Sequence, residues 1–164
     1  MEKETVSHPF LPIFDNESKI LILGSFPSVK SRETNFFYGH PRNRFWPLIA
    51  RLCQSEIPMT IEEKTNLLLT NHIAIWDVIA SCKIKGSSDS SIEQVIPNDL
   101  SIILDHADIK QVYANGGTAC RFYKKYTINQ TGKEIIQLPS TSPANAAWSK
   151  DKLFESWKQI LEVL

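Results

Sequence analysis

The sequence has no long hydrophobic run and no excess charge of either sign. In 164 residues, 18 basic side chains balance 18 acidic ones, so the formal net charge at pH 7 is zero. The apolar runs fall far short of the roughly 20 residues that a membrane-spanning helix requires. The first ten residues, MEKETVSHPF, carry charges where a secretory signal peptide needs an apolar core. These absences favour a single domain over residues 1–164, with no membrane partner and a cytoplasmic location by default.

Cysteine is scarce, and the common catalytic signatures are missing. Cys53, Cys82 and Cys120 form no C-x-x-C pair, which argues against a disulfide framework and a structural zinc site. The four histidines lack the spacing of metal ligands, and we expect His8 and His106 on the surface. Phosphate-loop, dinucleotide-binding and serine nucleophile-elbow patterns are absent. We therefore expect neither a metal site nor a cofactor.

Four short apolar segments have the pattern of buried strands, and helical patterns lie between them. The expected strands are residues 19–24, 72–79, 111–114 and 134–138. Expected helix starts are near residue 45, at the capping box 60–63, at Asn98, after residues 115–117 and at Ser149. This alternation predicts an α/β fold with a mainly parallel four-stranded sheet. Residues 1–18 are expected to form an arm on the core surface, and residues 81–91 a loop.

The segment from Gly24 to Trp46, GSFPSVKSRETNFFYGHPRNRFW, has neither helical nor strand periodicity up to its last few residues. Connections in compact domains usually run about 4–6 residues, and a disordered linker would lack aromatic residues such as Phe36 and Tyr38. Ligands of parallel sheets bind beyond the carboxyl ends of the strands. This loop leaves the first strand there, and residues 139–145 leave the last strand at the same edge. We therefore expect the two loops to face one another across a cleft.

The two loops supply side chains that suit a nucleic acid. Phe26 and Tyr38 offer rings, Asn35 and Asn43 offer amides, and residues 140–142 offer hydroxyls. Rings stack on bases, amides read hydrogen-bonding edges, and hydroxyls and cations hold phosphates. Within residues 28–51 the cations Lys30, Arg32, Arg42, Arg44 and Arg51 face only Glu33, so the long loop is locally basic. Such a set fits a base extruded from DNA.

These segments resemble the uracil-DNA glycosylase superfamily, most closely its hypoxanthine (deoxyinosine) DNA glycosylase branch. The resemblance rests on GSFPS at residues 24–28 with YGHPRNRFW at 38–46, on IWDVI at 75–79 and on LPSTSPANA at 138–146. It implies a three-layer α/β/α sandwich that acts without metal on a flipped deoxynucleotide. The related mismatch-specific uracil/thymine glycosylases carry Asn where this chain has Phe26. That difference points away from ordinary uracil excision.

The resemblance also implies catalytic roles for residues of the first motif. Asn43 is expected to orient water or to hydrogen-bond the departing base, since an amide does not titrate usefully as a general base. His40 is expected to donate a hydrogen bond to that base. Asn35 is the alternative to Asn43.

Further residues are expected to bind the base and the DNA. Tyr38 would stack on the base, Phe26 would form the pocket wall, and Gly24 with Ser25 would lie beneath it. Ser140, Thr141 and Ser142 would grip phosphates, Pro143, Ala144 and Asn145 would enter the duplex, and Arg42 and Arg44 would attract the DNA backbone.

Three functions remain open at this point. They are a monofunctional glycosylase that releases hypoxanthine, a glycosylase of the same fold that prefers uracil or another deaminated base, and a catalytically silent nucleic-acid-binding domain. A serine hydrolase has less support, because Ser25, Ser140 and Ser142 lack a nucleophile pattern. Asp77 fits either a structural or a site-facing role. The expected partner is double-stranded or single-stranded DNA with a deaminated base, bound by a monomer.

Overall fold

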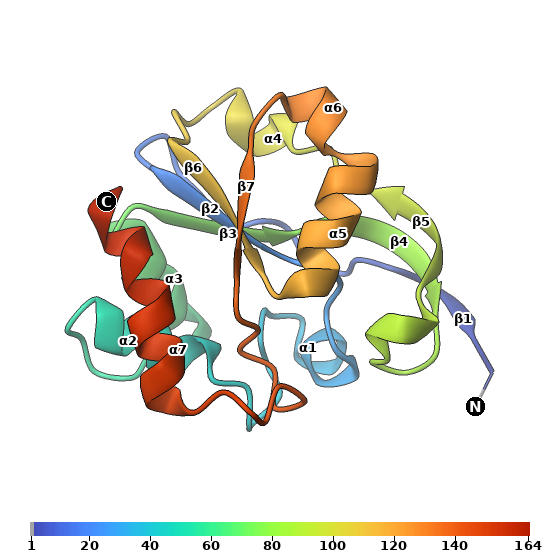
Figure 1. The fold of residues 1–164 in the computed structure, drawn as a ribbon, viewed down its shortest axis with the longest axis horizontal. Coiled ribbons are helices and arrows are strands. Elements are labelled where there is room, and N and C mark those ends of the chain that lie inside the picture. The colour runs from blue at the N-terminus through green and yellow to red at the C-terminus, as the bar shows by residue number, and fades with distance from the viewer. Residues whose placement is uncertain (1) are drawn as a thin grey trace.

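A parallel four-stranded sheet forms the centre of the protein, whose computed structural model describes residues 2–164 (Figure 1). Its strands are β2 (Ile20–Gly24), β3 (Ile73–Asp77), β6 (Gln111–Asn115) and β7 (Ile135–Leu138), in the order β3-β2-β6-β7. Every residue of β2 and β3 is buried, as their continuous apolar sequences indicate. All four strands lie within a few residues of their expected positions.

Helices cover both sides of this sheet (Figure 1). One side carries α5 (Gly117–Tyr126) and α6 (Ile128–Thr131), and the other carries α2 (Phe45–Leu52), α3 (Ile61–Thr70) and α7 (Lys150–Trp157). The hydroxyls of Thr60 and Ser149 accept backbone N–H groups at the starts of α3 and α7, as expected from the sequence. A short 3-10 helix, η2 (Lys158–Glu162), follows α7. The predicted three-layer α/β/α fold is confirmed.

A second, antiparallel sheet was not expected from the sequence. It contains β1 (Glu4–Ser7), β4 (Ile79–Ile84) and β5 (Glu93–Pro97), in the order β1-β4-β5. The arm of residues 1–18 therefore supplies a strand, and the loop expected at residues 81–91 is partly strand. Val78 separates β3 from β4, so the single strand expected at residues 72–79 belongs to two sheets. The buried positions of β4 are interrupted by Ser and Lys, which weakens its apolar pattern.

Three short helical segments complete the fold: α1 (Val29–Thr34), α4 (Ser101–Leu104) and η1 (Asp89–Ser91). The long loop is therefore partly regular, because Ser28 caps α1 by accepting the N–H of Ser31. Asn98 does not cap α4, contrary to expectation. Its buried amide instead donates to the carbonyls of Asp77 and Ile79, which fixes the chain where β3 passes into β4.

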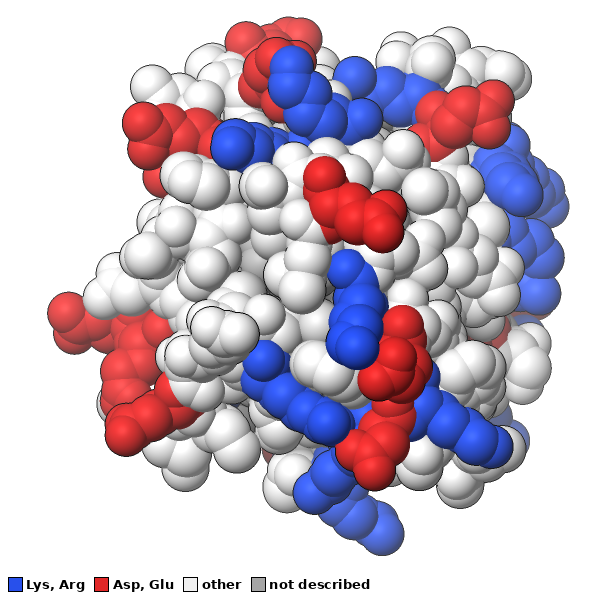
Figure 2. Space-filling model, turned by 60° about the vertical axis from the view of Figure 1, so that its left-hand side comes forward, with Lys and Arg blue, Asp and Glu red and all other residues white. Residues whose placement is uncertain are grey.

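Acidic and basic side chains are interspersed over the face that carries α2, α3 and α7 (Figure 2). No helix within residues 2–164 has the length and hydropathy needed to cross a bilayer, and no group of three or more potential metal ligands occurs among the same residues. The three cysteines are unpaired, and burial raises the pKa of the Cys82 thiol to about 11.

Candidate active site

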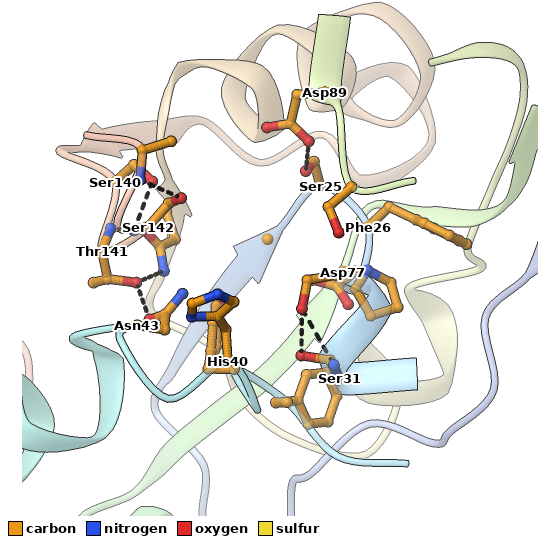
Figure 3. A pocket seen from close by; sticks show the side chains of 18 of the residues that line it. Ser25, Phe26, Ser31, His40, Asn43, Asp77, Asp89, Ser140, Thr141 and Ser142 are labelled. Carbon is orange, nitrogen blue, oxygen red and sulfur yellow. Dashed lines mark hydrogen bonds between the residues drawn. The ribbon is translucent and has the colours of Figure 1, made fainter. Parts of the chain in front are cut away.

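A cleft of about 390 Å³ lies at the carboxyl edge of the parallel sheet (Figure 3). β3 lies on one side of β2 and β6 on the other, and such a change of direction leaves a crevice where ligands bind. Gly24, Asp77 and Asn115 end these three strands and line the cleft. The two loops form its walls, as expected. The expected site residues that line it are Gly24, Ser25, Phe26, Tyr38, His40, Asn43, Ser140, Thr141, Ser142, Pro143 and Ala144.

The Asn43 side chain is held in one orientation. Its Oδ1 accepts the backbone N–H of Phe45 at 2.9 Å and the Thr141 hydroxyl at 2.9 Å. A carbonyl oxygen has two lone pairs, so both are in use. The Nδ2 group makes no hydrogen bond to any residue from 2 to 164 and points toward the cleft (Figure 3). Asn43 therefore presents a hydrogen-bond donor to a ligand.

Thr141 and Asn115 maintain that orientation. Asn115 Nδ2 donates to the Thr141 hydroxyl at 3.0 Å, and Asn115 Oδ1 accepts the Thr141 N–H at 3.0 Å. Because its oxygen accepts from Asn115, the Thr141 hydroxyl gives its own proton to Asn43. Thr141 is fully buried. The expectation that Thr141 grips a phosphate is therefore wrong, because its hydroxyl is used to join the two loops.

His40 offers a second donor beside Asn43. The backbone N–H of Arg42 donates to His40 Nδ1 at 3.1 Å, so the ring proton of neutral His40 lies on Nε2. The half-buried ring lines the cleft between Asn43 and Asp77 (Figure 3). Two N–H donors from one loop thus face the same space.

Tyr38 lies between the core and the cleft. Its ring stacks on Phe45, with centroids 4.0 Å apart and planes inclined by 21°. The hydroxyl is buried and has no hydrogen-bond partner among the described residues. Burial raises the pKa of this hydroxyl, and the nearby charge of Asp77 raises it further, so it stays a neutral donor.

Asp77 faces the site, which resolves the alternative left open by the sequence. Its Oδ2 lies 2.7 Å from Nε2 of His8, and the two side chains are only 5% and 4% exposed. The expectation that His8 lies on the surface is wrong, because the arm folds its ring inward against Phe10. Gly24 and Asp77 are register partners at the carboxyl ends of β2 and β3, which places the Asp77 side chain against the backbone of Gly24.

Two other expected site residues lie elsewhere. Asn35 ends α1 with a positive φ of 54° and is exposed outside the cleft, so it does not support the alternative to Asn43. Asn145 lines a neighbouring hollow beyond the second loop, and its amide donates to the carbonyl of Ser140 within that loop. The Asn145 side chain therefore stabilises the second loop itself.

Most of the cations within residues 28–51 bind carbonyl or carboxylate groups of the protein itself. Arg44 was expected to attract DNA, but its half-buried guanidinium donates to the carbonyls of Thr141, Ser142, Asn145 and Trp148. Arg32 donates to the carbonyl of Gly86, Lys30 pairs with Glu33, and Arg51 pairs with Asp151. Among the five cations, the exposed Arg42 alone has no such side-chain partner within the described residues. Arg44 thus shapes the second loop, and Arg42 is free to meet an anion.

Comparisons with known proteins identify the family of this chain. The profile of the Uracil DNA glycosylase superfamily matches residues 11–164. A protein of Methanosarcina acetivorans named hypoxanthine DNA glycosylase is 31% identical over 156 residues, which cover 94% of this chain and 98% of that protein. A protein of Methanosarcina barkeri with the same name is 33% identical over 138 residues, covering 83% and 86%.

A solved structure has the same fold. The solution NMR structure of a candidate uracil DNA glycosylase from Methanosarcina acetivorans matches with a TM-score of 0.80 and 32% identity, over 97% of this chain and 99% of that one. The superfamily inferred from the motifs is thereby confirmed. This chain belongs to the uracil DNA glycosylase superfamily.

Proposed function

We propose that this protein is a monofunctional hypoxanthine DNA glycosylase, which flips deoxyinosine out of DNA and hydrolyses its N-glycosidic bond. Two relatives of nearly the same extent carry that name. The observation in this chain that carries the proposal is the fixed donor of Asn43, whose oxygen is bound by Phe45 and Thr141. A donor at this point selects a base that presents an acceptor.

Hypoxanthine fits the two donors of Asn43 and His40. It carries O6 and N7 acceptors on one edge, as guanine does. Asn43 Nδ2 and His40 Nε2 can donate to such an edge. Adenine carries an amino group in place of O6 and would oppose donor with donor. Uracil presents an N–H between two carbonyls, and the Asn43 oxygen, which is already used, does not accept that N–H.

The same donors assist departure of the base. As the bond from the sugar to N9 breaks, negative charge develops on the purine, and fixed donors stabilise that charge. Asn43 therefore acts on the base, and its occupied oxygen leaves no acceptor for orienting water. Tyr38 is half-buried and lines the cleft, and its aromatic ring is suited to stacking on the base.

DNA binding is assigned to the rim of the cleft. Ser140 and Ser142 keep hydroxyl protons to donate, because their oxygens accept the N–H groups of Ser142 and Ala144. Pro143 and Ala144 form the tip that would enter the duplex. We assign Arg42 to the phosphate backbone, where each such contact steepens the dependence of affinity on salt. The proposed unit is a monomer that acts on double-stranded or single-stranded DNA.

A strand-nicking assay tests the function. Oligonucleotides with one deoxyinosine, deoxyuridine, deoxyxanthosine or deoxyadenosine, single-stranded or paired, are incubated with protein and then treated with alkali, which cleaves abasic sites. We expect cleavage chiefly at deoxyinosine, none at deoxyadenosine, and a single-turnover rate at least about tenfold lower for Asn43→Ala. Faster cleavage at deoxyuridine would favour the uracil-type enzyme. Binding without any cleavage would favour the silent DNA-binding domain.

A further inference from the structure

A buried histidine and carboxylate pair lies at the cleft, and the roles assigned above do not use it. His8 comes from the arm before β2, and Asp77 ends β3. The N–H of Phe10 donates to His8 Nδ1 at 3.4 Å, so the ring proton lies on Nε2 and is donated to Asp77 Oδ2 at 2.7 Å. His8 therefore holds the Asp77 carboxylate in place through one of its two oxygens.

The second oxygen of Asp77 is available to a ligand. No hydrogen bond within residues 2–164 engages Oδ1, and Asp77 lines the cleft. A Cβ added at Gly24 would lie 2.3 Å from this oxygen and 3.2 Å from the Tyr38 hydroxyl, so only glycine leaves room for them. The Tyr38 hydroxyl, itself unpartnered, is a donor beside the same spot. An acceptor and a donor thus meet beneath the cleft.

Asp77 and the donor of Asn43 lie on opposite sides of the cleft (Figure 3). A nucleotide held between them would have its base on the Asn43 side and its sugar within reach of the carboxylate. Hydrolysis of an N-glycosidic bond needs both groups, a donor for the leaving base and a base for the attacking water. The cleft supplies the donor from Asn43, in the loop before α2, and the base from Asp77, at the end of β3.

We infer that Asp77 is the catalytic base of this enzyme and that His8 is its positioning residue. The inference rests on the proposed glycosylase function. A water oxygen bonds to C1′ as the bond from C1′ to N9 breaks. The bonding electrons leave with hypoxanthine, and the proton of the water passes to Asp77 Oδ1 and later to the released base or to solvent. The negative carboxylate also stabilises the oxocarbenium-like sugar while that bond is broken.

Single-turnover excision, DNA affinity and base extrusion together separate this role from a structural one. Asp77→Asn keeps the shape and an acceptor for His8 but is not basic, so excision should slow at least about 100-fold, as for a lost general base. Affinity for a duplex with 2′-fluoro-deoxyinosine, which resists cleavage, should stay within about threefold of wild type. The fluorescence of 2-aminopurine beside the lesion should still report extrusion.

Two substitutions of His8 test the positioning role while Asp77 stays in place. His8→Leu removes the donor and should slow excision about tenfold, within the range for a displaced catalytic group. His8→Gln keeps an N–H donor and should restore most of the rate. Asp105→Asn and His106→Gln, exposed near the start of β6, are matched controls expected to behave as wild type. Thermal unfolding verifies the fold of every variant.

The outcomes distinguish this inference from the proposed function. Asp77→Asn with the wild-type excision rate overturns the role of Asp77 and leaves the glycosylase proposal standing. Equal losses of excision, affinity and extrusion also overturn it, since they indicate a structural role. If Asp77→Asn does not fold, His8→Leu and His8→Gln decide, and wild-type rates in both overturn the inference. A wild-type protein that releases no base from any lesion overturns both proposals.

Discussion

Replacing Thr141 by valine is a sharp test of how the site is held together. Valine has nearly the shape of threonine, so the fully buried side chain keeps its volume. The change deletes the hydroxyl that joins Asn115 to Asn43 and leaves Asn115 Nδ2 without its acceptor. An unsatisfied buried group costs about 1–3 kcal/mol. For a protein of this size, each kcal/mol lowers the melting temperature by about 2–4 °C.

The effect on excision follows from the amide of Asn43. Once Thr141 no longer donates, Oδ1 keeps only the N–H of Phe45, and the amide is free to rotate. Misplacing the donor to the leaving base should cost about 1.4 kcal/mol of transition-state stabilisation or more, which is a tenfold slower single-turnover rate. Affinity for 2′-fluoro-deoxyinosine DNA should change less than about threefold.

Thr141→Ser is the matched control. It keeps the hydroxyl and loses one methyl group, so stability should fall by about 0.8 kcal/mol while the excision rate stays near that of wild type. Single-turnover excision assays measure the rate, and thermal unfolding measures the stability. If Thr141→Val excises as fast as Thr141→Ser, the hydroxyl does not position Asn43 and the reasoning is refuted.

Three further predictions concern neighbouring parts of the site. Asn43→Asp should lower the excision rate more than Asn43→Ala, because a carboxylate replaces the donor and repels the leaving anion; equal rates would contradict this. Gly24→Ala should reduce excision at least about tenfold in the same assay, because its Cβ meets Asp77 Oδ1 at 2.3 Å. Arg42→Gln should reduce the salt slope of DNA binding by about one, whereas Arg44→Gln should lower the melting temperature and leave that slope unchanged, as measured by fluorescence anisotropy and thermal unfolding.

Much of the fold follows from local sequence. The apolar runs of β2 and β7 and the capping residues Thr60 and Ser149 depend on neighbours within a few positions, which a sequence displays directly. The second sheet escaped prediction because β1 pairs with β4 across a long separation in sequence. Its pairing depends on where the arm meets the core, which no local pattern records.

The sequence by itself determined the four parallel strands, the two loops and the motif residues that line the cleft. The periodicity of apolar residues and the composition of a loop are local properties, which a sequence displays directly. Only the tertiary structure decided which groups those residues contact. It turned the oxygen of Asn43 toward Thr141, engaged Arg44 with loop carbonyls, and brought His8 to Asp77 across 69 positions. The physical reason is that a hydrogen bond is settled by which groups face one another in space, and that is fixed only when distant segments pack together.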